Sequence, residues 1–345
     1  MVSLLSFLLV IAICVISHEY GHYKTARLAG VQVHEFAFGM GPVIWQTRNL
    51  EGTLWSVRIF PIGGFVRLAG MDEEKPGEQI RDNGSFSDKR AIQRFFILFN
   101  GALSNIILAI ILTALLLSGH GILDLQSTMV GELMSGYPAE KIGLAKGDVI
   151  TEINGIQVAD WPEMSDLIKK VALQENPVEI SVSRGKEILR FQVTIPLDKE
   201  LGVPLLGIRP SFLRFSLAGA TVKAFSYIFQ MSLEWIKGIY FLLTNRAEVD
   251  ITGPVGIASM AGQAARSGFW SFLSFLAIIN LNLGLINLFP FPGLDGGRLV
   301  FVFLEMISGR KVPEKIENYI HFAGFILLIA LVIFITWKDI LRIFQ

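Results

Sequence analysis

Long apolar runs constrain this chain more than any other feature. Four of them reach or approach the roughly 20 apolar residues that a helix needs to cross a bilayer, namely residues 2–17, 95–119, 269–294 and 319–337. Charged residues make up only 17% of the 345 residues, whereas a soluble domain carries about 25%. The sequence therefore predicts an α-helical polytopic membrane protein with four transmembrane helices.

The first apolar run resembles the core of a signal peptide. It lacks the basic start and the small-residue cleavage site of such peptides, and it continues directly into the charged motif HEYGH. We therefore expect it to remain in the mature chain as a transmembrane helix.

A fifth apolar stretch, residues 218–243, contains Lys223, Glu234 and Lys237. Each charge at the centre of a bilayer costs at least about 2.5 kcal/mol on insertion scales. We interpret this stretch as an amphipathic helix that lies at the membrane surface or packs on the bundle.

Basic residues near the spans predict the orientation. With four spans they gather on one side, which the positive-inside rule assigns to the cytoplasm: Lys24, Arg27, Lys89, Arg90, Arg94, Arg298, Arg310, Lys311 and Lys315. The N-terminus, residues 121–267 and the C-terminus are then extracytoplasmic, in a multi-pass protein of the inner or plasma membrane. The net charge of zero gives no indication of a nucleic-acid partner.

Two regions between the spans have a different composition. In residues 31–70, VIWQTRN and LWSVRIF are rich in β-branched and aromatic residues and flank a turn-prone LEGT. GMGP and PIGGFVRLAG place chain breakers on both sides. Residues 125–196 are more charged and combine short strands, one helix and glycine turns. Their pattern GLxxGDxIxxxNG, at residues 143–155, resembles a PDZ domain.

The expected organisation follows from these patterns. It comprises a first transmembrane helix (1–30), a membrane-associated β segment (31–72), a cytoplasmic linker (73–94), a second transmembrane helix (95–120), an inserted extracytoplasmic PDZ domain of α+β class (121–200), an extracytoplasmic amphipathic region (201–267), a third transmembrane segment (268–300), and a cytoplasmic loop with the fourth transmembrane helix (301–345).

The motif His18-Glu19-Tyr20-Gly21-His22 indicates zinc chemistry. On a helix, positions i and i+4 share a face, so both imidazoles can reach one Zn²⁺. Zinc lowers the pKa of a bound water to about 7, and Glu19 can accept its proton as the general base. The motif ends an otherwise uncharged span, where ionisable groups are costly unless they pair or bind something.

A catalytic zinc needs a third protein ligand, for which Asp295 in NLFPFPGLDGG is the candidate. Pro290, Pro292 and the glycines break the helix there, which membranes tolerate where backbone lines a cavity. Asp295 could instead cap a helix, although that role does not explain the clustered breakers. With four spans all three ligands fall toward the cytoplasmic side, whereas a fifth span would separate them.

In combination, HEYGH, the PDZ-like insert and NLFPFPGLDGG resemble the site-2 proteases, which are intramembrane zinc metalloproteases. The bacterial regulator-of-sigma-E type, here with one PDZ domain, is similar over nearly the whole chain, including PIGGFVRLAGMDEE and GPVGIASMAGQAA. The resemblance implies regulated intramembrane proteolysis. The substrates that this resemblance implies are single-pass transmembrane proteins, such as anti-sigma factors or remnant signal peptides, which an upstream protease has already trimmed.

The resemblance also implies further roles. The β segment would re-enter the membrane and present a strand edge to an unwound substrate. Asn287 would contact or position substrate, and Asn105 would line the site. For both asparagines the alternative is a hydrogen bond between helices in lipid, and for Asn105 it is an equal alternative.

Alternatives remain at two levels. A PDZ-bearing membrane scaffold or holdase with a vestigial metal site is the second hypothesis, and a metal transporter is the third. The PDZ domain itself would either exclude substrates with folded ectodomains or capture a newly trimmed C-terminus.

Overall fold

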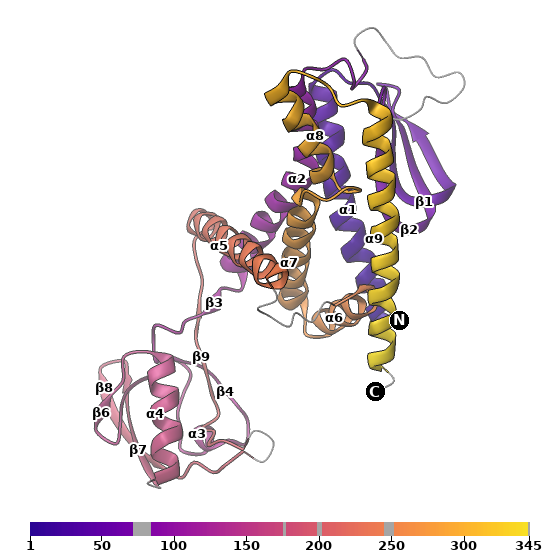
Figure 1. Cartoon of the computed structure of the whole chain (residues 1–345). Helices are drawn as coiled ribbons and strands as arrows, with labels where there is room; N and C mark the ends of the chain where they lie inside the picture. Colours follow the sequence, from indigo (N-terminus) through magenta and orange to yellow (C-terminus); the bar gives the residue numbers. More distant parts are fainter. Residues whose placement is uncertain (72–83, 175–176, 199–201, 245–251, 344–345) are drawn as a thin grey trace. The chain divides into compact units, whose positions relative to one another are not determined.

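The computed structural model describes residues 1–71, 84–174, 177–198, 202–244 and 252–343 (Figure 1). The chain forms two compact units, Met1–Leu116 with Gly219–Gln345, and Leu117–Ala218. The first contains the long helices and the second contains most of the short strands. Of the predicted cytoplasmic linker, residues 73–83 lie outside the described part of the chain.

Four helices of the described chain are long and apolar enough to cross a membrane. They are α1 (Val2–Leu28), α2 (Ala91–Gly119), α7 (Phe269–Leu288) and α9 (Glu314–Ile343). These are the four spans predicted from the sequence, and α5 (Leu217–Leu243), with its internal charges, is not among them.

Glycines let the membrane helices approach closely. A Cβ atom at Gly21 of α1 would overlap the carbonyl oxygen of Asn100 in α2, and one at Gly284 of α7 would lie 2.9 Å from the carbonyl oxygen of Ala102. Such small residues bring backbones together where lipid offers no hydrophobic driving force. As a result α2 packs against both α1 and α7.

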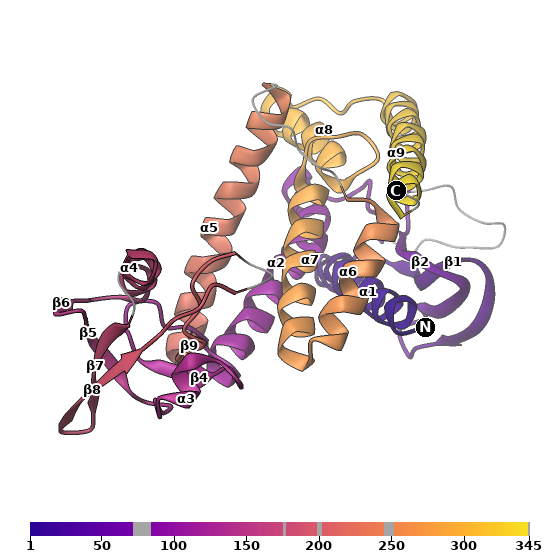
Figure 2. The same ribbon diagram turned by 90° about the horizontal axis from the view of Figure 1, so that it is seen from below.

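Strands β1 (Val33–Arg48) and β2 (Leu54–Leu68) form an antiparallel pair that packs on α1 (Figure 2). Each strand bends back on itself, so Phe36 has two registered partners, Val66 on one side and Trp55 on the other. Residues 64–68 therefore form an outer edge of this sheet in the described part of the chain. The glycines expected to end the strands instead adopt positive φ, for example 85° at Gly39, and the strands continue through irregular register.

The long apolar run at 269–294 is interrupted. Helix α7 ends at Leu288, residues 289–294 form a loop, and α8 (Asp295–Ser308) begins at the acidic residue itself. Pro290 and Pro292 lack the N–H that helix continuation requires. Residues 295–308, predicted from the sequence to be divided between a membrane segment and a cytoplasmic loop, form one short helix.

A second short helix, α6 (Pro254–Arg266), precedes α7. Its first backbone N–H groups donate to the buried carboxylate of Asp339 on α9, over 3.2 Å from Gly253 and 2.9 Å from Gly256. The negative charge also suits the positive end of the helix dipole. The N-terminal end of α6 is thereby bound to α9.

The second unit has its own apolar core of α+β class. Its largest sheet has the antiparallel order β6-β5-β7-β8, from Ile156–Gln157, Val149–Ile153, Val178–Arg184 and Glu187–Val193, with the helices α3 (Pro138–Lys141) and α4 (Trp161–Gln174). Two smaller antiparallel pairs join β4 (Val130–Leu133) to β9 (Ile208–Pro210) and β3 (Ile122–Leu123) to β10 (Phe212–Leu213).

An ion pair between a buried carboxylate and a partly exposed guanidinium supports this sheet. Arg184 Nε donates to Asp148 Oδ1 over 2.7 Å, and the Asp148 side chain is only 1% exposed. The hydrogen bond from Arg184 is the main cause that lowers the pKa of Asp148 below its usual value.

Candidate metal centre and its cavity

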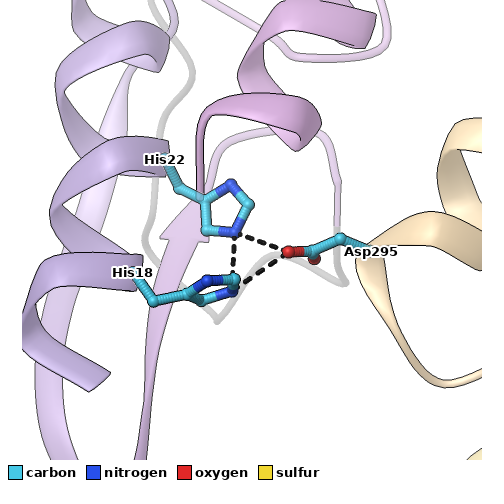
Figure 3. A group of neighbouring side chains, drawn as sticks. All are labelled: His18, His22 and Asp295. Carbon is cyan, nitrogen blue, oxygen red and sulfur yellow. Dashed lines mark hydrogen bonds and ion pairs between the residues drawn. The ribbon is translucent and has the colours of Figure 1, made fainter. Parts of the chain in front are cut away.

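Three potential metal ligands converge from two helices (Figure 3). His18 and His22 lie one turn apart on α1, and Asp295 is the first residue of α8. One carboxylate oxygen, Asp295 Oδ2, lies 3.0 Å from His18 Nε2 and 3.1 Å from His22 Nε2. The two Nε2 atoms are 3.3 Å apart. The three donor atoms therefore form a nearly equilateral triangle.

The His22 ring is held from two sides. Its Nδ1 lies 2.8 Å from the carbonyl oxygen of Ile97, and a Cβ atom at Gly101 would overlap its Nε2. Both contacts come from α2. A carbonyl oxygen only accepts hydrogen bonds, so His22 Nδ1 carries a proton.

This orientation creates an electrostatic requirement. With its proton on Nδ1, the neutral His22 ring directs the unshared electron pair of Nε2 toward Asp295 Oδ2, which is itself electron-rich. Two acceptors 3.1 Å apart repel each other unless a proton or a metal cation lies between them. A divalent metal satisfies both atoms and also His18 Nε2.

The distances fit zinc. Ligand atoms at zinc's preferred distances of about 2.0–2.1 Å lie about 3.3 Å apart in a tetrahedron, and the three measured separations are 3.0, 3.1 and 3.3 Å. Two imidazoles and one carboxylate form a known catalytic type of donor set, which leaves a fourth position open. No other group of three potential metal ligands occurs in the described residues.

The loop before Asp295 is closely packed. A Cβ atom at Gly296 would overlap the carbonyl oxygen of Phe289, and one at Gly324 of α9 would overlap that of Pro292. The backbone N–H of Gly293 donates to His321 Nδ1 of α9 over 3.0 Å. The last span therefore braces the loop that delivers Asp295.

A cavity of about 210 Å³ opens beside the three ligands. Glu19 lines it, as do Gly64, Phe65, Val66 and Leu68 of β2. The Glu19 carboxylate accepts a hydrogen bond from the backbone of Val66. The outer edge of the sheet is thus placed next to the proposed general base.

The two asparagines named in the sequence analysis lie in different surroundings. Asn287, in the last turn of α7, brings its Nδ2 within 3.4 Å of His18 Nδ1. Asn105 is fully buried on α2, and its amide has no hydrogen-bond partner in the described part of the chain. Neither is among the described residues that line the cavity.

Sequence reasoning missed two residues at this site. Gly101 underlies the His22 ring, and the only available signal was a small residue within an apolar helix. Arg298 lines the cavity and adds positive charge near Glu19 and Asp295. Arg298 directly follows LDGG, but in the sequence it was used only to predict the orientation of the spans in the membrane.

Comparisons with known proteins place these features in context. The sequence profile of peptidase family M50 matches residues 6–331. A Campylobacter jejuni protein provisionally named a zinc metalloprotease is 33% identical over 99% of this chain and 94% of its own length. Zinc metalloprotease RasP is 29% identical in Oceanobacillus iheyensis, over 100% of both chains, and 30% identical in Shouchella clausii, over 99% of this chain and 100% of its own.

Among solved structures, the PDZ domain of an SdrC-like protein from Listeria innocua is 28% identical. The match covers 24% of this chain and 92% of that chain, with a TM-score of 0.21.

Proposed function

This chain belongs to peptidase family M50. From that premise we propose that it hydrolyses peptide bonds within the membrane, with an active site formed by His18, His22, Glu19 and Asp295. It is a zinc metalloprotease and a multi-pass membrane protein. The observation that carries the proposal is the triangle of ligand atoms 3.0–3.3 Å apart beside a cavity that Glu19 also lines.

The proposed mechanism divides the chemistry between the metal and the side chains of the site. When bound, zinc supplies Lewis-acid chemistry that polarises the scissile carbonyl and acidifies water. His18, His22 and Asp295 would hold it. Glu19 would accept a proton from the attacking water and then deliver it to the leaving amine nitrogen. The backbone hydrogen bond from Val66 supports this assignment because it directs the carboxylate within the cavity.

Substrate would bind as an extended segment. A transmembrane helix hides its amides in its own hydrogen bonds and must unwind before it can be cut. In the membrane the released N–H and C=O groups need new partners. Residues 64–68 of β2 offer them, since they form a sheet edge and line the cavity. We therefore propose that substrate adds to this edge as a strand.

The finer assignments follow the site-2 protease resemblance. We propose that the substrates are single-pass membrane proteins, such as anti-sigma factors or remnant signal peptides, that an upstream protease has trimmed. The same proposal makes the second unit an extracytoplasmic PDZ domain and places both termini outside the cytoplasm. Its support is the pattern at 143–155 together with the distribution of basic residues around the four spans.

The test is cleavage by the purified full chain in lipid nanodiscs. The probe is a single-pass model protein with a short external stub, and mass spectrometry of the fragments locates the cut. We expect cutting inside the apolar segment, loss of cutting after zinc is removed by a chelator, and its return with added zinc. A scaffold or holdase would bind the probe and leave it intact, and this result would overturn the proposal.

A further inference from the structure

The two histidines of the metal centre use their second ring nitrogens differently. His22 Nδ1 lies 2.8 Å from a backbone carbonyl, that of Ile97. His18 Nδ1 has a side-chain neighbour instead, the amide of Asn287 at 3.4 Å. The two contacts are made by different helices, α2 and α7.

The chemistry of a histidine ligand specifies what this neighbour must do. When Nε2 binds a metal, Nδ1 carries the proton and donates it to an acceptor, which fixes the tautomer and the ring orientation. Ile97 provides that acceptor for His22. Since the oxygen and nitrogen of an asparagine amide are assigned only from their hydrogen bonds, a half-turn of the Asn287 amide places Oδ1 opposite His18 Nδ1.

We propose that Asn287 is a positioning residue for the metal ligand His18. The inference rests on the proposed function, because it assumes that His18 Nε2 binds zinc. Asn287 would accept the Nδ1–H of His18 and hold the ring so that Nε2 points at the metal. It would act through His18 and would not itself touch zinc.

The position of Asn287 supports this role over direct substrate contact. It faces Nδ1, whereas Asp295 meets Nε2 of the same ring, so the two contacts use different ring nitrogens. Asn287 is not among the described residues that line the cavity where substrate would bind. It is also fixed in place, because Gly284 one turn earlier packs directly on α2.

Three variants and a control test the proposal. Asn287→Leu removes the acceptor while keeping a similar volume, and Asn287→Asp retains an acceptor oxygen. Asn280→Leu is the matched control, because Asn280 lies two turns earlier on α7, where its amide donates to the carbonyl of Leu276 within the same helix. Asn287→Ser supplies a smaller truncation if the leucine variant does not fold.

The measurements are zinc affinity, by competition with a chromophoric chelator, and the visible spectrum of the cobalt-substituted protein. We expect Asn287→Leu and Asn287→Ser to weaken zinc binding about 10- to 100-fold, the usual effect of losing a partner of a histidine ligand, and to alter the cobalt spectrum. Asn287→Asp should stay within about threefold of the unmodified chain, since a carboxylate accepts the same hydrogen bond. Asn280→Leu should change neither readout.

The outcomes separate this inference from the proposed function. If the unmodified chain binds no zinc, the proposed function fails and this inference fails with it. If the unmodified chain binds zinc but Asn287→Leu and Asn287→Ser bind it equally well with an unchanged cobalt spectrum, only the positioning role is overturned. A raised KM with unchanged zinc affinity would assign Asn287 to substrate contact instead.

Discussion

Asp295 Oδ2 lies 3.1 Å from His22 Nε2, although 273 positions separate the two residues in the chain. His22 reaches this point from the first membrane helix, and Asp295 reaches it from a short helix that starts where an apolar run breaks. The proposed chemistry requires that a cation join them, and this requirement leads to the first prediction.

Purified protein should contain about one zinc per chain, the stoichiometry of a mononuclear catalytic site. Replacing His18, His22 or Asp295 by Ala should lower the zinc content in each case, because three protein ligands are needed to retain the metal. Elemental analysis against protein concentration measures the ratio. His120→Ala, in the other unit, serves as the control. Full zinc content in Asp295→Ala would remove Asp295 from the ligand set.

Glu19→Gln should keep zinc and lose most activity. The amide retains the shape of the side chain but cannot accept the proton, and general-base catalysis contributes about 10²- to 10⁴-fold. Cleavage of the model substrate in nanodiscs measures the loss, with Glu234→Gln on the exposed face of α5 as the control. Native cleavage by Glu19→Gln would show that another group takes the proton.

Gly101→Ala should displace the His22 ring, since its Cβ would overlap Nε2. We expect zinc affinity to fall about 10-fold or more while the helices remain folded. Gly238→Ala on α5 is the matched control, because its Cβ would enter open space. It should leave zinc binding unchanged and slightly favour the helix. Equal zinc binding by both variants would contradict the close contact of Gly101 with the ring.

The Asp148–Arg184 pair predicts how the second unit responds to acid. Because the folded state lowers the pKa of Asp148, its contribution to stability is present above the unfolded pKa of about 3.9 and is lost as the pH falls through the lower folded value. After correction for the intrinsic exchange rate at each pH, the protection of the β5 and β7 amides in the full chain should therefore fall as the medium is acidified across this window. Asp148→Asn should be less stable at neutral pH and show a weaker acid dependence. An identical acid profile in the variant would remove Asp148 as the cause.

Deletion of residues 125–196 distinguishes the two proposed roles of the second unit. A size filter predicts that the deleted protein gains cleavage of a substrate with a folded ectodomain and still cuts the trimmed form. Peptide capture predicts that cutting of the trimmed form falls and the untrimmed substrate stays intact. Paired substrates that differ only in the ectodomain make the measurement, after zinc retention by the deleted protein is confirmed. We favour the filter, which an intact untrimmed substrate would exclude.

How much of the fold and of the candidate site the sequence predicts depends on how far apart in the chain the interacting residues lie. His18 and His22 are neighbours through the geometry of a single helix, so their spacing in sequence is sufficient. Asp295 was linked to them by the parity of the spans, since four spans put all three residues at one side. The spans are predictable because each depends only on the apolar character of consecutive residues.

What could not be predicted depends on contacts between elements. The packing of α1, α2 and α7 determines two of these contacts. It brings Gly101 against the His22 ring, and it brings the Asn287 amide to Nδ1 of His18. Helix α8 has only 14 residues, so its apolar pattern is too short to separate from the run before it. The glycines of β1 and β2 resemble chain breakers because the sequence alone does not show whether a glycine with positive φ ends a strand or lies within one.

The bracing of the 289–294 loop by α9 sets an order of events during synthesis. The histidine pair is synthesised before Asp295, and His321 and Gly324, which hold the loop before Asp295, are synthesised later still. A nascent chain with only its first spans inserted therefore has an incomplete centre. We therefore expect a chain that ends before α9 to lack the support of this loop and to have no proteolytic activity.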